Sequence, residues 1–400
     1  MECLRITLIK NTRRWKFSQT FGREGHEPRG DSRPRLSSRA QLDRPFADRL
    51  SGALFCPDSR GQLSPRGLCL TNTVSAVMNL TSSVILKLNW RPTSGSTLQS
   101  IVMPIELRRL SFVQFDVFSA RPFEGNSLAV VPDARGLSDQ MMQALAREMN
   151  LSETTFVLPR DPATERERGV RVRIFTVQEE LPFAGHPTLG TAFALRGSTG
   201  AGEVALELNV GRVPVRFEEK SGEPVFGEMT QVEPKFGLIH DRETVVRAAG
   251  LRDGDIDPSL PIQTISTGLP FTIVPLRGLD VMRRLQVNPA TSSEYLRQSG
   301  GGTAFYFVSR ETVDPPARLH ARMLFYGGED PATGSAAGCA TAWMVAHGVA
   351  QPDEPVLIEQ GVEMLRPSRI FVRASRRDNK VVNVRVGGNA VEVLRGEISF

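Results

Sequence analysis

Two short stretches, ELPFAGH at residues 180–186 and EDPATGS at residues 329–335, organise this chain of 400 residues. Three residue types recur in them at a constant offset of 149 residues: Glu180 and Glu329, Pro182 and Pro331, and Gly185 and Gly334. A strand is predicted before each stretch and a helix of small, apolar residues after it, over residues 188–195 and 336–346. Self-similarity at one period indicates a duplication, so we expect two pseudo-symmetric halves.

Outward from these stretches, the sequence from residue 104 to residue 400 favours strands over helices. Helices are predicted after Ser138 and near residues 242–250, 279–286 and 292–299. Strands are predicted near residues 112–118, 128–131, 154–158, 170–176, 204–218 (a hairpin), 262–276, 303–308, 319–326, 355–359, 369–374 and 381–394. This excess of strands predicts an α+β fold and makes a doubly wound nucleotide-binding fold a poor expectation. We expect one domain over residues 104–224 with about 388–400, and a second over residues 225–387.

The first 102 residues differ in composition from the rest of the chain. They hold 16 Lys and Arg against 7 Asp and Glu, a formal charge of +9, which leaves −4 for the remainder. Residues 23–60 are polar and turn-forming, a composition typical of disorder. We therefore expect residues 1–102 to be a disordered or artefactual extension, with translation starting at Met103. A basic segment can attract nucleic acid, but no aromatic-and-basic module accompanies this one, so no nucleic-acid partner is expected.

The overall composition narrows the class of protein. A hydrophobic fraction of 40% and a charged fraction of 23% are typical of a globular protein. No apolar run is long enough for a spanning helix, so no membrane partner is expected. The four cysteines include no CxxC pair, which favours a reducing compartment, and we expect a cytoplasmic location. No spacing of His, Cys and carboxylates resembles a metal site, so we expect no metal.

The repeated turns have the chemistry of an anion site. Glycine allows a close approach of the backbone to a ligand, and the first N–H groups of a helix have no partner within it. These donors, with a partial positive charge at each helix start, favour a negative ligand. We expect the two turns to face one cleft and bind a small carboxylate-bearing substrate. The substrate-binding residues would be Gly185, Pro187, Thr333, Gly334 and Ala336.

Four residues near these turns are candidates for proton transfer. Glu153 begins a strand in apolar surroundings that would raise its pKa, although a glutamate at a strand end can also be a plain surface residue. Asp330 precedes a helix start and could equally be a simple cap. His186 and Ser335 occupy equivalent places in the two stretches; a lone His is often structural, and Ser335 has the character of a donor. Cys339, within the second small-residue helix, is interpreted as buried packing.

Several separate motifs, in the same order, resemble the phenazine biosynthesis PhzF-like family. They are FDVF (115–118), RPFEGN (121–126), NLSET (150–154), RIFT (173–176), ELPFAGHP (180–187), EDPATGSA (329–336), QG (360–361) and RPS (366–368). The resemblance extends from about residue 111 to residue 400. One departure is Val177, which stands where the family usually has Pro after RIFT.

The resemblance implies a fold, an activity and a set of site residues. The fold is that of diaminopimelate epimerase, in which two pseudo-symmetric domains each wrap a mostly antiparallel sheet around a central helix. The implied activity is that of a cofactor-independent isomerase, whose phenazine-pathway member moves a proton on a dihydro-hydroxyanthranilate. The acid/base residue maps onto Glu153, and the other catalytic residues onto His186, Asp330 and Ser335. A homodimer is plausible on the same basis.

Two alternatives to this enzyme differ from it in mechanism or in class. Related epimerases and racemases use two cysteines in the corresponding turns, and neither ELPFAGH nor EDPATGS contains one, so a two-thiol mechanism is excluded. A non-catalytic small-molecule-binding protein on the same fold remains the other interpretation. An isomerase would exchange substrate protons with solvent, whereas a binding protein would not.

Overall fold

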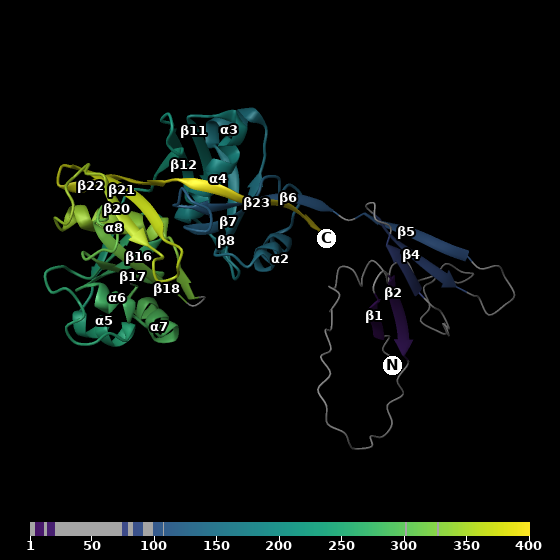
Figure 1. Cartoon of the computed structure of the whole chain (residues 1–400), viewed down its shortest axis with the longest axis horizontal. Helices are drawn as coiled ribbons and strands as arrows, with labels where there is room; N and C mark the ends of the chain where they lie inside the picture. The colour runs from purple at the N-terminus through teal and green to yellow at the C-terminus, as the bar shows by residue number, and fades with distance from the viewer. Residues whose placement is uncertain are drawn as a thin grey trace, which may run out of the picture. The chain divides into compact units, whose positions relative to one another are not determined.

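The computed structural model describes residues 108–300, 302–325 and 328–400, together with five strands in the N-terminal quarter. The chain divides into two compact units, residues 1–108 with Phe400, and residues 109–399 (Figure 1). The strands of the first unit form one antiparallel sheet in chain order: β1 (Arg5–Asn11), β2 (Arg14–Thr20), β3 (Val74–Met78), β4 (Ser83–Trp90) and β5 (Gln99–Glu106). The predicted disorder concerns mostly residues outside the described ones, and the start at Met103 stays a prediction.

The second unit begins with the elements that surround the first repeated turn. The strands are β6 (Arg109–Val117), β7 (Asn126–Val131), β8 (Glu153–Leu158), β9 (Val170–Phe175), β10 (Glu180–Leu181), β11 (Glu203–Leu208) and β12 (Gly211–Glu218). The helices are α2 (Asp139–Met149), α3 (Pro162–Arg168), α4 (Gly185–Arg196) and the short 3₁₀ helix η1 (Gly197–Thr199). Ser138 caps α2 as predicted, since its side chain accepts a hydrogen bond from the N–H of Met141.

The elements around the second repeated turn follow. The strands are β13 (Phe226–Thr230), β14 (Lys235–Ile239), β15 (Gln263–Ser266), β16 (Pro270–Leu276), β17 (Ala304–Ser309), β18 (Leu319–Phe325), β19 (Gly328–Asp330), β20 (Val356–Gln360), β21 (Ser368–Arg377), β22 (Lys380–Gly388) and β23 (Ala390–Ser399). The helices are α5 (Arg242–Ala249), α6 (Leu279–Arg283), α7 (Pro289–Ser299) and α8 (Gly334–Ala346).

Strand pairing reveals the duplication that the repeated stretches predicted. Most neighbouring strands pair antiparallel, but β7 pairs parallel with β8, and β9 with β11. The same two parallel pairings recur as β16 with β17 and β18 with β20. In each half a strand of only two or three residues, β10 or β19, then leads into the central helix. The predicted α+β fold with a mostly antiparallel sheet around helices is therefore confirmed.

The two central helices are buried because they are apolar on every side. Twelve consecutive residues of α8, from Gly334 to Val345, are buried, and α4 is buried over most of its length. A helix that is hydrophobic all round needs surroundings on all sides, which the curved strands supply. Figure 1 shows α4 among the strands of the first half and α8 among those of the second. Each repeated turn is therefore the entry to a core helix.

The chain crosses between the halves near its C-terminus. Strand structure was predicted near residues 381–394, and the structure divides it between two strands: β22 ends at Gly388 and β23 begins at Ala390. The carbonyl of Asn389 accepts a hydrogen bond from the N–H of Phe118, so a tertiary contact interrupts the strand pattern. β22 pairs with β13 and β23 pairs with β6. Because residues 109–399 form one compact unit, the predicted domain boundaries stay a prediction.

A buried ionic cluster joins β18 to β20 behind the second turn. His320 is fully buried, with Nδ1 2.7 Å from a Glu359 oxygen and Nε2 3.1 Å from a Glu363 oxygen. Burial lowers the pKa of His320, but its hydrogen bonds to Glu359 and Glu363 outweigh that effect and raise the pKa to about 9. Beside it, Arg322 binds both carboxylate oxygens of Glu329, the residue before Asp330.

This cluster predicts a loss of stability in alkaline solution. A histidine whose native pKa exceeds its unfolded value of 6.5 stabilises the fold fully below that pH, and the contribution disappears as the pH rises through about 9. Replacing His320 with Gln should therefore destabilise the protein more at pH 6 than at pH 10. We expect the two costs in free energy of unfolding to differ by on the order of 3 kcal/mol. Urea unfolding at both pH values measures it. An equal cost at both would contradict the assignment of a charged His320.

Candidate active site

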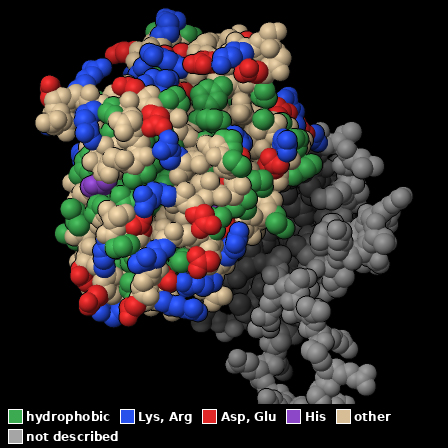
Figure 2. Space-filling view, turned by 60° about the vertical axis from the view of Figure 1, so that its left-hand side comes forward, with side chains coloured by type: hydrophobic (Ala, Val, Ile, Leu, Met, Phe, Trp, Pro, Cys, Tyr) green, Lys and Arg blue, Asp and Glu red, His purple; other side chains and the backbone are tan. Residues whose placement is uncertain are grey.

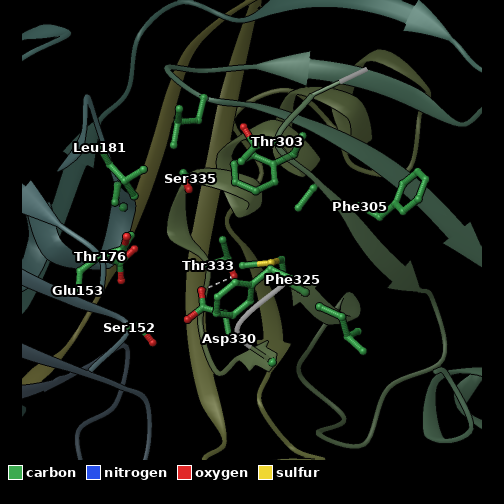
Figure 3. A pocket seen from close by; sticks show the side chains of 18 of the residues that line it. Ser152, Glu153, Thr176, Leu181, Thr303, Phe305, Phe325, Asp330, Thr333 and Ser335 are labelled. Carbon is green, nitrogen blue, oxygen red and sulfur yellow. Dashed lines mark hydrogen bonds between the residues drawn. The ribbon is translucent and has the colours of Figure 1, made fainter. Parts of the chain in front are cut away.

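The two repeated turns line one cavity of about 520 Å³. Both helix starts reach it, through Gly185 and His186 of α4 and through Gly334 and Ser335 of α8. Figure 3 shows Glu153 projecting toward it from the first half and Asp330 from the second. The polar groups of the cavity therefore gather where the two repeated turns, 149 positions apart in the sequence, come together.

Both helices begin without a capping side chain. The residues before them, Ala184 and Thr333, make no side-chain hydrogen bond to the first turn. In α4 the third position is Pro187, which has no N–H, so only the first two residues offer free donors. In α8 the corresponding three residues all carry an N–H group. These uncapped donors and the helix dipoles make the place where the helices meet attractive to an anion.

The helix starts approach each other so closely that only glycine fits. A Cβ atom added to Gly185 would lie 2.5 Å from the carbonyl carbon of Gly334 and 2.5 Å from the amide nitrogen of Ser335. A Cβ added to Gly334 would lie 2.8 Å from the ring of Phe118 and 3.2 Å from the Cα of Gly185. The glycines were predicted to allow a close approach to a ligand, and here they allow the two turns to touch each other.

Glu153 and His186 present polar atoms without partners. Glu153 begins β8, His186 is the second residue of α4, and Glu153 Oε2 lies 3.3 Å from His186 Nε2. Among the described residues neither atom makes a hydrogen bond, although both are buried. Burial also lowers the pKa of His186 to about 3, so the ring is neutral and the two do not form an ion pair. Unpartnered buried polar atoms are costly, which points to a ligand that supplies partners.

Asp330 lies at the same end of the cavity, at the close of β19. One carboxylate oxygen accepts hydrogen bonds from Asn126 Nδ2 at 2.7 Å, and the other from Thr333 Oγ1 at 2.6 Å. The Thr333 contact is drawn in Figure 3. Burial raises the pKa of Asp330, and hydrogen bonds from Thr333, Asn126 and Ser152 oppose this rise. Asp330 is therefore held in a defined orientation rather than acting as a helix cap.

The pKa of Glu153 is raised well above its ordinary value of 4.5. Burial is the main cause, and the negative charge of Asp330 adds to it. Two carboxyl groups close together in a buried site resist being ionised at once. Glu153 can consequently hold or release a proton nearer to neutral pH than an exposed glutamate could. This is the property that general acid/base chemistry requires.

Much of the remaining cavity wall is apolar and comes from the second half, with Thr176, Glu179 and Leu181 added from the first. It includes Phe271, Val287, Leu296, Phe305, Met323 and Phe325. No lysine or arginine stands among the described residues that line the cavity. A ligand's negative charge would consequently rest on the helix starts and hydroxyl groups, with its body against hydrocarbon.

The structure brings most of the predicted site residues together. Seven of them line the cavity: Glu153, Gly185, His186, Asp330, Thr333, Gly334 and Ser335. Pro187 and Ala336 do not line it; both are buried in the third position of their helices, and Pro187 has no N–H to donate. Cys339 is fully buried in α8, in keeping with its interpretation as packing.

Two polar residues of the site were missed by the sequence analysis. Asn126 binds Asp330 from the start of β7, and Gln360 supports the turn that follows it. The Gln360 amide donates to the carbonyl of Asp330 and accepts from the N–H of Thr333. Asn126 and Gln360 stood within motifs of the resemblance. Their polar side chains at strand ends could have marked them, but their partners are remote in sequence.

A search against protein-family profiles matches residues 115–396 to a family described as phenazine biosynthesis-like protein. An uncharacterized isomerase from Mesorhizobium japonicum is 39% identical over 72% of this chain and 98% of its own length. The chain belongs to this PhzC–PhzF family. Trans-2,3-dihydro-3-hydroxyanthranilate isomerase from Pseudomonas fluorescens is 36% identical over 72% of this chain and 99% of its own length.

Solved structures agree with the family assignment. The crystal structure of a PhzF-family phenazine biosynthesis protein from Bacillus anthracis matches 73% of this chain and 99% of that one, with 29% identity and a TM-score of 0.65. A predicted epimerase from Pseudomonas aeruginosa is 37% identical with a TM-score of 0.63, over 72% and 99% of the two chains. The family relatives are named isomerases, so the predicted class of enzyme is confirmed.

Within the described part of the chain, no group of three or more His, Cys, Asp or Glu side chains could hold a metal ion. No helix there is both long and apolar enough to cross a membrane. The cytoplasmic location and the homodimer stay predictions.

Proposed function

We propose that this member of the PhzC–PhzF family is a cofactor-independent isomerase that moves a proton on a small carboxylate-bearing metabolite. The observation that carries the proposal is the pair of unpartnered buried atoms, Glu153 Oε2 and His186 Nε2, at the end of a cavity closed by two uncapped helix starts. A substrate carboxylate would take the free N–H groups. The reacting carbon would then lie against Glu153.

Proton transfer by Glu153 accounts for its raised pKa. In its ionised form, Glu153 would remove a proton from carbon beside an unsaturated or carbonyl system, and the electron pair would shift the double bond. The neutral carboxylic acid would then return the proton to a different carbon. Atoms and charge balance without a further reagent. A positioned acid/base group of this kind contributes roughly 10²–10⁴ in rate.

The neighbouring residues would hold the substrate during this transfer. Neutral His186 would donate from Nε2, and the Ser335 hydroxyl would add a donor from α8. Asp330, oriented by Asn126 and Thr333, would accept a hydrogen bond or relay a proton. Because Asp330 carries negative charge beside Glu153, it also keeps the pKa of Glu153 high enough for the returning step.

The lining of the cavity limits the class of substrate. With no cation among the described lining residues, the site suits one carboxylate better than two, and its apolar wall suits a ring or short hydrocarbon. Trans-2,3-dihydro-3-hydroxyanthranilate, the compound in the name of the Pseudomonas relatives, carries one carboxylate on a six-membered ring. The face in Figure 2 mixes Lys and Arg with Asp and Glu and presents no uniformly basic area that would favour nucleic acid.

The function is tested by turnover of trans-2,3-dihydro-3-hydroxyanthranilate and of its carboxamide analogue. We expect the acid to be isomerised and the carboxamide to lose roughly 5- to 30-fold in kcat/KM, because two helix starts together favour an anion by about 1–2 kcal/mol. Product formation is followed by chromatography. An acid that binds but is recovered unchanged would favour the non-catalytic binding protein. Equal turnover of both compounds would contradict the carboxylate site.

A further inference from the structure

Asn126 connects the two halves of the site through a single nitrogen atom. Asn126 Nδ2 lies 2.7 Å from an oxygen of Asp330, 2.9 Å from the carbonyl oxygen of Ala332 and 3.1 Å from His186 Nδ1. The side chain is 1% exposed and belongs to the start of β7. It therefore contacts both candidate catalytic residues from outside the repeated turns.

The contacts identify which atom of the Asn126 amide faces the site. Asp330 and Ala332 present oxygen acceptors, so the atom between them is the NH₂ nitrogen and not the amide oxygen. That nitrogen has two hydrogens for three neighbours, so one hydrogen is shared. An amide nitrogen does not accept hydrogen bonds. His186 Nδ1 must therefore face it with a lone pair.

This arrangement determines the tautomer of His186. Neutral imidazole carries one hydrogen, and if Nδ1 has a lone pair the hydrogen is on Nε2. His186 Nε2 lies 3.3 Å from Glu153 Oε2, on the side that lines the cavity. The ring consequently presents an N–H donor to the cavity. In the other tautomer, the cavity would face a lone pair beside two carboxylates.

The turn that precedes Asn126 is held firmly enough to define its position. Asp116 accepts hydrogen bonds from the N–H of Phe123 at 2.7 Å and from Arg366, whose guanidinium also binds the carbonyl of Gly125 at 2.8 Å. Gly125 has φ of +69°, and a Cβ there would lie 2.3 Å from the carbonyl oxygen of Val117. Asn126 is thus fixed by a partly buried ion pair and a glycine turn.

We propose that Asn126 is a positioning residue that keeps His186 in the Nε2–H tautomer and orients the Asp330 carboxylate toward the reacting group. Its effect on turnover rests on the proposed function, whereas its effect on the tautomer does not. A purely structural Asn126 would affect folding without changing the proton position on His186. The two roles therefore differ in a measurable property.

The test is ¹⁵N NMR of the full chain labelled at histidine, because protonated and unprotonated ring nitrogens have clearly different signals. The chain contains five histidines, so the His186 signals are assigned by their loss in His186→Gln. We expect His186 to be neutral with its proton on Nε2. In Asn126→Asp, the new carboxyl oxygen replaces the donor with an acceptor, and we expect the proton to move to Nδ1.

The kinetic arm uses trans-2,3-dihydro-3-hydroxyanthranilate as the substrate. We expect Asn126→Asp to lower kcat by roughly 10²-fold or more with a small change in KM, by analogy with catalytic histidines held in the wrong tautomer. Asn379→Asp is the matched control: Asn379 is an exposed hairpin-turn residue with φ of +61°, a conformation that Asp also tolerates. It should leave both the His186 signals and kcat unchanged.

The outcomes separate this proposal from the proposed function. A wild-type proton on Nδ1, or an unchanged tautomer in Asn126→Asp, would overturn the positioning role. If Asn126→Asp does not fold, the wild-type spectrum alone tests the positioning role, because that role requires the His186 proton to be on Nε2. If His186 has the expected tautomer but the compound is not turned over, the proposed function fails and the role of Asn126 in fixing His186 stands.

Discussion

Replacing Glu153 with Gln is expected to reduce turnover by roughly 10²–10⁴-fold while the protein continues to fold and to bind a carboxylate ligand. Gln has the same shape but cannot take or return a proton. Initial rates with trans-2,3-dihydro-3-hydroxyanthranilate measure the first effect, and calorimetric titration measures binding. Unchanged turnover would remove Glu153 from the catalytic role.

The same substitution is expected to raise the melting temperature at neutral pH. The pKa of Glu153 is higher in the fold than its unfolded value of 4.5, so the native state binds its proton more tightly. The free energy of unfolding therefore falls as the pH rises above 4.5, and Gln removes that penalty. The stability gain should vanish near pH 4. Glu148→Gln, an exposed change on α2, is the matched control and should affect neither turnover nor melting.

Replacing Gly185 with Ala is expected to damage the site and the fold together. The new Cβ would lie 2.5 Å from two backbone atoms of the other helix start, and backbone cannot rotate away as a side chain can. We expect the free energy of unfolding to fall by about 1–3 kcal/mol, the usual cost of overpacking. Separating the helix starts by about 1 Å should reduce kcat/KM by roughly 10²-fold.

Gly202→Ala is the control for this substitution. Gly202 has nothing within 4 Å of an added Cβ and no left-handed backbone angle, so alanine should fit there without cost. Urea unfolding and steady-state kinetics on both variants make the comparison. Wild-type activity in Gly185→Ala would mean that the helix starts need not touch for the site to work.

The repeated turns could be predicted because their information is local. Gly and Pro at fixed positions, followed by small apolar residues, predict a turn into a buried helix wherever they occur, and the shared offset of 149 residues indicated the duplication. Glu153 has a weaker local signal, its place at the start of a strand in apolar surroundings. Its position 3.3 Å from His186 brings together residues that are 33 positions apart, so the sequence left a plain surface residue open and the family resemblance favoured the acid/base role.

Features that depend on remote contacts were missed. Asn126 binds residues 60 and 204 positions away, and nothing in the residues next to it indicates those partners. The break between β22 and β23 was missed for the same reason, because its cause is the contact of Asn389 with Phe118. Helix α3 was missed despite local signals, since Asp161 caps it and Pro162 begins it.

The central claim is that Glu153 carries a proton from one carbon of a bound carboxylate to another. It is tested most directly by turnover of trans-2,3-dihydro-3-hydroxyanthranilate in ²H₂O, with the product analysed by mass spectrometry and NMR. We predict deuterium at the carbon that gains the proton, since the Glu153 carboxyl exchanges its proton with solvent before returning it, and a roughly 10²–10⁴-fold lower rate of incorporation in Glu153→Gln. Product formed at the wild-type rate by Glu153→Gln, with the same deuterium content, would contradict the account.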